Sequence, residues 1–511
     1  MSRIENTSKN FVFSLLATVV TAITSFVSRT VFIHTIGVDY LGANSLFTNV
    51  LSMLSLTELG ISSAIGFSLY APLARKDVPA IKALMQFYKR AYQIIALVIA
   101  ILGLSLLPFL KYIIKDPGNI RHIPFIYIVF LYNTAVSYLF TYKTTLLVAD
   151  QKSYVMTNMT AVINIITVAV QTTILLLFRN YFVYLILGAI INTVQWYFIN
   201  RRIFSLYPYL KEKDAQPLDQ ETKQVITKNV KAMVFHKFGE LCINQTDNII
   251  ISSFISITAV GIYNNYYMVI GIINRFAQSI FGAATASLGN LIATESCERR
   301  YEVFKRYNFL GFWVFGWTGI CLLTLLNPFV ELWLGKEFLI DDLTLGLVML
   351  NYYLVGMRVT IGNVKMAAGL YSQDQWAPMA QAVINLVVSI WGAIHLGLAG
   401  VFLGTVVSSL AIPCWYRPVI VYKYAFQRSA REYFVYYALY FGVVVLNLFL
   451  VTAINRCFVD SIVTNAYFAF VLKMLVCAAV PNGVIVLLFH RTEEFRYLYT
   501  LIVSMLARFK K

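Results

Sequence analysis

The chain has 511 residues, of which 59% are hydrophobic and only 13% are charged. Soluble globular proteins carry about 25% charged residues, and their cores do not absorb this much apolar surface. The composition therefore excludes a soluble globular protein. The formal net charge of +17 follows from basic loops on one side of a membrane, so it does not indicate nucleic-acid binding.

Apolar runs long enough to cross a bilayer recur along the whole chain. A transmembrane helix needs about 20 predominantly apolar residues. By this criterion we predict an all-α polytopic membrane protein with about 14 transmembrane helices, at residues 11–34, 41–67, 91–110, 122–148, 155–178, 180–200, 232–256, 260–292, 308–328, 343–369, 377–396, 399–422, 433–455 and 463–490.

The sequence also contains an internal repeat. At an offset of 219, Lys9-Asn10 matches Lys228-Asn229, and residues 41–44 match residues 260–263. At an offset of 221, residues 161–166 match residues 382–387. Three matches in the same order indicate a duplicated unit, and many transporters are built from two similar halves around a central site.

The repeat and the polar segments together predict the domain organisation. Residues 201–231 form the longest polar segment, which we expect to link an N-terminal six-helix bundle, residues 1–200, to a C-terminal six-helix bundle, residues 232–424. Spans 13 and 14, within residues 425–490, lie beyond the repeat as an appended pair. Residues 491–511 mix apolar and basic side chains, and we expect an amphipathic helix on the inner leaflet.

The distribution of basic residues predicts that both termini are cytoplasmic. With a cytoplasmic N-terminus, the inside segments carry 27 lysines and arginines and the outside segments carry six. Loops rich in lysine and arginine stay on the cytoplasmic side of a membrane. An even number of spans then places the C-terminus on the same side.

Eight basic residues fall inside the predicted spans, and each costs about 2.5 to 3.5 kcal/mol there if it faces lipid. Only Glu58, Glu240 and Asp247 offset them within the spans. The excess of positive charge predicts a watery cavity that favours an anion. The eight basic residues are Arg29, Lys143, Lys237, Arg275, Arg358, Lys365, Arg417 and Lys473.

The position along the span separates these residues. Arg275 and Arg358 lie near the middle of their spans, where a side chain cannot readily reach the headgroups, so we expect both to line the cavity. Lys143, Lys365 and Arg417 lie near cytoplasmic ends, where the alternative is that the long side chain extends to the headgroups.

Polar residues form a stripe on the first span. Their spacing of three or four residues places them on one face of a helix, with Arg29 beside its outer end. The stripe consists of Ser14, Thr18, Thr21, Ser25 and Ser28. The alternative is that small hydroxyl residues only allow close helix packing.

The seventh span carries a matching stripe. Lys237, Glu240, Asn244 and Asp247 lie 219 residues after Thr18, Thr21, Ser25 and Ser28, so the same helix face is polar in both halves. The tenth span adds Asn351, Arg358 and Lys365 at intervals of seven. Together these stripes predict a polar cavity between the halves, although Lys237 and Glu240 are also placed to pair with each other.

Sequence signals for catalysis are absent. There is no P-loop, the six cysteines lack metal-ligand spacing, and the five histidines are scattered. The predicted external loops are short, the longest being about a dozen residues at 331–342. We therefore expect no enzymatic activity, no metal and no cofactor.

Several segments together resemble one family. They are Arg3 to Asn10, Ser28 to Thr30, Ile36 to Gly42, Leu54 to Ile61, Ala64 to Tyr70, Asp247 to Ser252 and Val260 to Tyr266. In this combination the sequence resembles the bacterial polysaccharide and O-antigen flippases, the Wzx-type transporters of the MOP (multidrug/oligosaccharidyl-lipid/polysaccharide exporter) superfamily. That superfamily also contains lipid II flippases and multidrug antiporters.

The resemblance implies a fold and a function. The fold would be two six-helix bundles around a central V-shaped cavity, flanked by the appended pair. The substrate would be an oligosaccharide on undecaprenyl diphosphate, a unit of O-antigen, capsule or exopolysaccharide. It would move from the inner to the outer leaflet of the bacterial cytoplasmic membrane by alternating access, in the company of other polysaccharide assembly proteins.

The resemblance also assigns roles to residues. In related flippases an arginine of the first span contributes to diphosphate recognition, and Arg29 is the matching position. With Arg275 and Arg358 it would bind the diphosphate through paired hydrogen bonds, with Lys237, Lys365 and Lys143 as further cationic positions. The candidates for ion coupling or counter-ions are Asp247, Glu240, Glu58 and His236.

Two alternatives stay open at the level of sequence. A multidrug or cation antiporter of the same superfamily would be expected to use acidic cavity residues, whereas this chain has more basic ones within its spans. A scaffold of a polysaccharide assembly complex that transports nothing is the other alternative.

Overall fold

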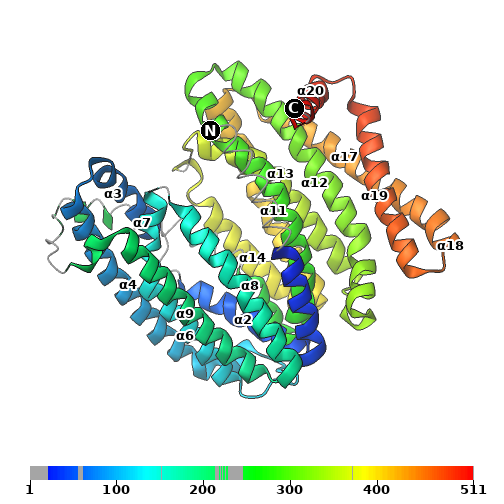
Figure 1. Cartoon of the computed structure of the whole chain (residues 1–511). Helices are drawn as coiled ribbons and strands as arrows, with labels where there is room; N and C mark the ends of the chain where they lie inside the picture. Colours follow the sequence, from blue (N-terminus) through cyan, green and yellow to red (C-terminus); the bar gives the residue numbers. More distant parts are fainter. Residues whose placement is uncertain are drawn as a thin grey trace. The chain divides into compact units, whose positions relative to one another are not determined.

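The structure is a computed structural model that describes residues 21–55, 61–150, 152–212, 218, 220, 222–224, 226–227, 245–370 and 372–509. Every regular element in these ranges is a helix (Figure 1). Ten of the described helices are long and apolar enough to cross a membrane. The prediction of an all-α, multi-pass membrane protein is confirmed.

The chain folds into two compact units, Met1–Gly261 and Ile262–Lys511. The first unit contains helical residues 21–36 and 245–254. Its other elements are α2 (Val38–Leu54), α3 (Ile61–Arg75), α4 (Val78–Leu106), the 3₁₀ turn η2 (Leu107–Phe109), α5 (Leu110–Ile113), α6 (Ile123–Thr141), α7 (Thr144–Ala149), α8 (Ser153–Phe178), α9 (Tyr181–Leu206) and the 3₁₀ turn η3 (Pro208–Lys211).

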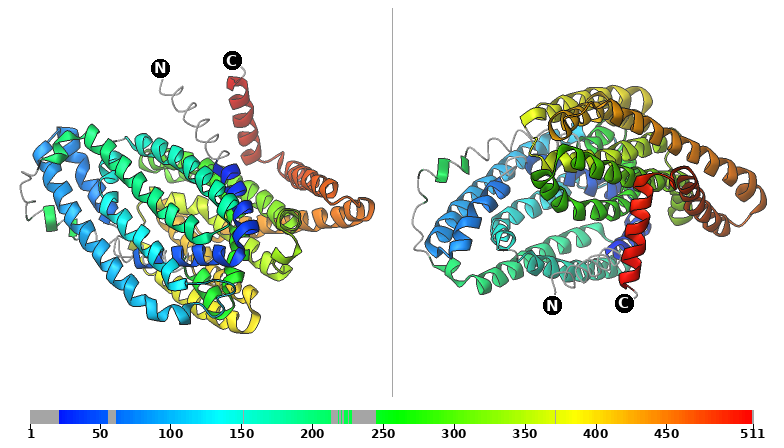
Figure 2. Two further views of the ribbon diagram at one scale, coloured as in Figure 1. Left: turned by 60° about the horizontal axis from the view of Figure 1, so that its bottom comes forward. Right: turned by 90° about the horizontal axis from the view of Figure 1, so that it is seen from above.

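Four long helices make up most of the first unit. Helix α4 packs on α6, α6 packs on α9, and α9 packs on α8, so the four lie side by side in Figures 1 and 2. Between α6 and α9, Asn192 Nδ2 donates to Asn133 Oδ1 at 3.2 Å, and the hydroxyls of Tyr132 and Thr193 are 3.1 Å apart. Such hydrogen bonds between polar side chains hold helices together in a bilayer.

Two of the helices differ from the predicted spans. Helix α4 starts at Val78, thirteen residues before the apolar run, because Asp77 caps its first turn by accepting from Ala80 N at 3.0 Å. The predicted span 122–148 is interrupted, since α6 ends at Thr141 and α7 begins at Thr144. An apolar window detects the run but not the local break.

The second unit begins within α11 (Ile257–Thr294). This helix matches the eighth predicted span but is not among the ten apolar helices counted above. The later elements are α12 (Cys297–Leu334), η4 (Lys336–Phe338), α13 (Asp342–Ala367), η5 (Ser372–Asp374), α14 (Ala377–Leu396), α15 (Leu398–Ala411), α16 (Pro413–Val421), the π-helix η6 (Tyr422–Phe426), α17 (Arg431–Ile454), the π-helix η7 (Asn455–Val459), α18 (Asp460–Ile462), α19 (Ala466–Phe489) and α20 (Glu493–Phe509).

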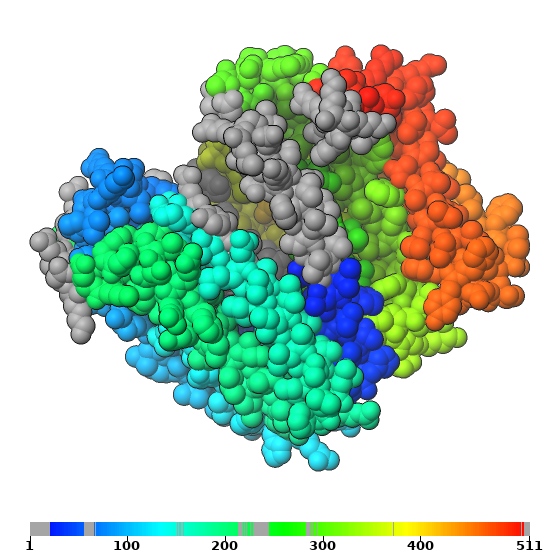
Figure 3. All heavy atoms as spheres, viewed as in Figure 1, coloured from blue at the N-terminus to red at the C-terminus, as the bar shows by residue number. Residues whose placement is uncertain are grey.

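The appended pair consists of α17 and α19, and both helices pack on α12. Aromatic side chains fill this contact, with the rings of Phe312 and Tyr440 stacked at 4.3 Å and the rings of Phe309 and Phe489 5.2 Å apart. Figure 3 shows the side chains of α17 and α19, coloured orange to red, as a continuous face of the second unit.

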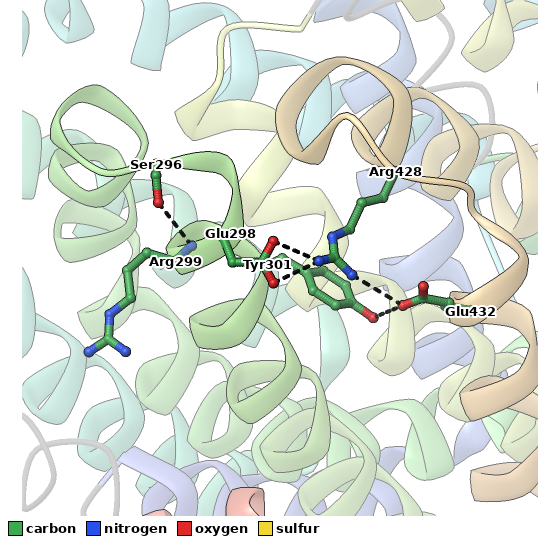
Figure 4. Close-up of polar contacts among 6 residues, drawn as sticks. All are labelled: Ser296, Glu298, Arg299, Tyr301, Arg428 and Glu432. Carbon is green, nitrogen blue, oxygen red and sulfur yellow. Dashed lines mark hydrogen bonds and ion pairs between the residues drawn. The ribbon is translucent and has the colours of Figure 1, made fainter.

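Polar contacts among residues of α12, of α17 and of the turn before α17 fasten the appended pair at one end (Figure 4). Arg428 Nη2 lies 2.7 Å from both carboxylate oxygens of Glu298, and its guanidinium stacks over the ring of Tyr301 at 4.4 Å. The Tyr301 hydroxyl donates to Glu432 at 2.5 Å. The Glu298 carboxylate is exposed and the Arg428 guanidinium is partly covered, so solvent weakens this ion pair, which mainly sets the orientation of the two elements.

The start of the tail helix α20 packs on the bundle. Phe495 and Leu498 are buried, and the ring of Phe495 stacks on that of Trp313 at 5.5 Å. Tyr499 and Val503 are exposed. Figure 2 shows α20 leaving α19 at a marked angle. Contact with the inner leaflet therefore stays a prediction for the exposed part of this helix.

Helices α14 and α15 pack closely against each other in the second unit. A Cβ atom placed on Gly392 would come far inside van der Waals contact with the carbonyl oxygen of Gly400. A Cβ atom on Gly400 would collide in the same way with the carbonyl oxygen of Gly392. Small residues allow backbones to approach in this way, which increases the dispersion contacts that stabilise helix pairs in lipid.

We expect Gly392→Val to lower the melting temperature of the detergent-solubilised protein by several degrees, because overpacking costs about 1 to 3 kcal/mol. Gly442→Ala on α17 is the matched control, since a Cβ there meets nothing within 4 Å. Thermal unfolding followed by size-exclusion chromatography measures both. Equal melting temperatures for the two variants would contradict the close contact.

Candidate functional site

Arg29 lies on helix 21–36 in the first unit, with Thr21, Ser25 and Ser28 on the same helix. Its Nη1 atom is buried and has no hydrogen-bond partner. Tyr184 on α9 is the neighbouring group that acts on it electrostatically. No carboxylate among the described residues pairs with this guanidinium, so its charge is available for a ligand.

Several predicted residues lie outside the described ranges. They are Ser14, Thr18, Glu58, His236, Lys237, Glu240 and Asn244. Of the seventh-span stripe only Asp247 is described, and one of its carboxylate oxygens is buried without a partner. No described lysine or arginine forms an ion pair with Asp247.

The second unit places its predicted residues in different surroundings. The side chain of Arg275 is exposed although it lies near the middle of α11. Arg358 on α13 is only 7% exposed and contacts Ser409 and Cys414. Asn351 accepts a hydrogen bond from Ser409 Oγ at 3.4 Å. Arg275 and Arg358 therefore occupy different environments, one accessible and one enclosed.

The two lysines at the predicted cytoplasmic ends are both buried. Lys365 forms an ion pair with Asp374, and both side chains are almost completely enclosed. Lys143 instead contacts Asn200 Oδ1 and lies over the ring of Phe204 at 4.3 Å. Each lysine has a partner within its own unit, so neither extends freely to the headgroups.

A set of contacts around Asp39 was not anticipated from the sequence. Thr258 Oγ1 donates to Asp39 Oδ1 at 2.7 Å, and the backbone N and side-chain Nδ2 of Asn119 donate to Oδ2 at 3.0 and 3.3 Å. Asp39 lies in the first turn of α2, where the helix dipole also favours a carboxylate. We call Asp39, Asn119 and Thr258 the Asp39 latch.

The latch joins equivalent positions of the repeat. Thr258 is 219 residues after Asp39, and Gly261 is 219 residues after Gly42. A Cβ on Gly42 would collide with the carbonyl oxygen of Ile257, and a Cβ on Gly261 would collide with the carbonyl oxygen of Val38. Ile257 is in turn 219 residues after Val38. The contact is therefore reciprocal, as expected at a pseudo-twofold axis between duplicated segments.

Backbone hydrogen bonds extend the same contact. Lys115 N donates to Ser252 O at 3.1 Å, and Ile257 N donates to Asp116 O at 3.3 Å. The ammonium of Lys115 donates to Phe254 O at 2.8 Å. The sequence signal for this contact was the repeat itself, which matched residues 41–44 to residues 260–263 but did not predict that the two segments touch.

We expect Asp374→Asn to destabilise the protein by about 3 to 5 kcal/mol, because it leaves the Lys365 ammonium buried without its counter-ion. The double variant Lys365→Met with Asp374→Leu should recover most of the loss. Glu302→Gln, which breaks the exposed pair with Arg299, is the control and should change little. Thermal unfolding of the native protein and the three variants measures these effects. Equal destabilisation by Asp374→Asn and Glu302→Gln would contradict a buried ion pair.

Comparison with known proteins relates this fold to transporters. No protein-family model and no curated protein matches the sequence. A multidrug resistance MATE family transporter of the MOP superfamily, in an inward-facing conformation, has a TM-score of 0.59 and 12% identity, covering 76% of this chain and 92% of its own. The lipid II flippase MurJ, in an inward closed conformation, has a TM-score of 0.64 and 13% identity, covering 94% and 99%.

At these identities the likeness concerns the fold. The two matches agree with the prediction made from the repeat and the motif segments, whereas the narrower polysaccharide flippase family stays a prediction. The chain has the fold of MOP-superfamily transporters.

Proposed function

We propose that this protein is a flippase that moves an oligosaccharide linked to undecaprenyl diphosphate from the inner to the outer leaflet of a bacterial cytoplasmic membrane. The observation that carries the proposal is the uncompensated guanidinium of Arg29 within the membrane. A buried cation without a counter-ion costs several kcal/mol, and a diphosphate offers both the charge and the paired acceptors that a guanidinium fits.

Arg275 supports the same substrate class. An exposed arginine near the middle of a transmembrane helix is costly against lipid but is stable in a water-filled cavity. Together with Arg29, this arginine favours an anionic headgroup over a cationic drug. The sugars would then contact neutral polar side chains such as Thr21, Ser25 and Ser28.

The fold supports a lipid-linked substrate. The structure that covers 94% of this chain and 99% of its own is described as a lipid II flippase. The appended pair gives this chain a length similar to that protein, whereas the multidrug transporter match covers 76% of the chain. A multidrug antiporter is the alternative, because that transporter has the same fold.

The Asp39 latch suggests how one side of the protein closes. In the predicted orientation, residues 37–42, 113–121 and 252–261 lie at the outer ends of their helices. The latch would hold these ends together while the headgroup enters from the cytoplasm, and would separate when the substrate leaves. An inside-negative potential drives this direction, since each negative charge moved outward gains about 2.3 kcal/mol per 100 mV.

We expect Arg29→Gln and Arg275→Gln each to reduce transfer of undecaprenyl-diphosphate oligosaccharide across proteoliposomes about tenfold or more, because each removes a charge-assisted hydrogen bond. The measurement is the sidedness of the lipid at equal protein content. Arg299→Gln, an exposed arginine paired with Glu302, is the matched control and should transfer normally.

Three outcomes separate the candidate functions. Loss of transfer in the two variants with normal transfer in the control supports the flippase. No transfer by the native protein, with uptake of a cationic dye driven by an ion gradient, would replace it with the antiporter. No transport of either kind by a folded protein would favour the scaffold.

The latch makes a separate prediction. Ile257 is completely buried in the latch contact, so Ile257→Cys should react slowly with a membrane-impermeant maleimide from the outside. Adding Asp39→Ala removes three hydrogen bonds and should speed labelling severalfold, in a background where the exposed Cys457 is replaced by serine. Unchanged labelling would show that the latch does not control access.

A further inference from the structure

Arg358 is a buried charged group of the second unit that the proposed transport cycle does not use. It is 7% exposed and lies on α13, enclosed by α15 and α16. Its contacts are long and involve neutral acceptors: Nη1 lies 3.4 Å from Ser409 O and 3.3 Å from Cys414 Sγ, and Nη2 lies 3.5 Å from Ser409 Oγ. No carboxylate among the described residues forms an ion pair with it.

Three buried tyrosine hydroxyls of the second unit also lack hydrogen-bond partners. They belong to Tyr353 on α13 and to Tyr433 and Tyr437 on α17. The rings of Tyr353 and Tyr437 are 6.2 Å apart and those of Tyr433 and Tyr437 are 5.8 Å apart, so the three form one cluster. The charge of Arg358 acts on both Tyr433 and Tyr437.

This combination is energetically unfavourable as it stands. A buried hydroxyl without a hydrogen bond costs about 1 to 3 kcal/mol, and a buried cation without a counter-ion costs several more. Another buried cation of the same unit has a counter-ion, since Lys365 forms an ion pair with Asp374. A group that carries negative charge and accepts several hydrogen bonds would satisfy Arg358 and the tyrosines together.

We propose that Arg358, Ser409 and the hydroxyls of Tyr353, Tyr433 and Tyr437 form a buried binding site for a small inorganic anion of the halide class, at the junction between the second bundle and α17. The anion accepts hydrogen bonds from the guanidinium and from the tyrosines. It stabilises the attachment of the appended pair, because its ligands come from both α13 and α17.

The repeat supports a role at this junction. At the offset of 221, the position equivalent to Arg358 is Ser137 on α6. The Ser137 hydroxyl is satisfied within its own helix by Thr134 O at 2.7 Å. The equivalent position of the first half therefore carries a serine, whereas Arg358 lies in the unit where α17 packs.

Halide-dependent thermal stability tests the site. The purified native protein is unfolded in detergent in gluconate buffer and in chloride or bromide buffer of equal ionic strength. A ligand that binds only the folded state raises the melting temperature in a saturable manner. We expect a rise of several degrees with halide, and Arg358→Gln should abolish this dependence.

Tyr437→Phe provides a milder variant in case Arg358→Gln fails to fold. It removes one donor and keeps the ring, so the half-saturating halide concentration should rise about tenfold. Tyr436→Phe is the matched control on the same helix, with a more exposed side chain, and should leave the halide dependence unchanged.

Crystals grown in bromide give a second, independent readout. An anomalous bromide peak beside Arg358 supports the site. Three results would each overturn it: a native melting temperature that is independent of halide, a halide effect that persists in Arg358→Gln, or bromide peaks only elsewhere. None of these measurements requires the oligosaccharide substrate, so the inference stands or falls separately from the flippase proposal.

Discussion

The close approach of α2 to the start of α11 is the contact on which the organisation of the first unit depends. Gly42 and Gly261 bring two backbones together where no side chain fits, and the carboxylate of Asp39 receives the hydroxyl of Thr258 beside them. Gly42 meets Ile257 and Gly261 meets Val38, and these two pairs are related by the repeat offset of 219. The two copies of one duplicated segment therefore form the two sides of the contact. A helix pair of this kind is held by dispersion and directed hydrogen bonds, since lipid supplies no hydrophobic drive for association.

The buried cations of this protein differ in whether a partner within the protein compensates their charge. Lys365 has a carboxylate, and Lys143 has an amide oxygen and aromatic rings. Arg29 Nη1 has no hydrogen-bond partner, and Arg358 makes long contacts with neutral atoms of Ser409 and Cys414. An uncompensated charge gives a membrane protein no stability, and this is the reason for which we propose a ligand at each arginine. Our proposals therefore give Arg29 a diphosphate and Arg358 a small anion as ligand, because Arg29 lies on a helix with a polar stripe and Arg358 is enclosed by α15 and α16.

Much of the fold was predictable because long apolar runs have few stable forms in a bilayer. Ten predicted spans correspond to described helices that are apolar enough to cross, and the appended pair after the repeat is present as α17 and α19. The errors lie at element ends: the cap at Asp77 extends α4, and α7 is separated from α6 around Lys143. Caps and breaks depend on single side chains, which an apolar window averages out.

The sequence alone determined the membrane class, the repeat, the excess of positive charge within the spans and the candidate arginines, because composition and periodicity are properties of the chain itself. Only the tertiary structure decided which charges are compensated. Lys365 and Arg358 are seven residues apart on one helix face, yet one meets Asp374 and the other meets Ser409 and Cys414. Whether a buried charge finds a partner depends on which distant helix packs against it, and spacing along one helix carries no information about that neighbour.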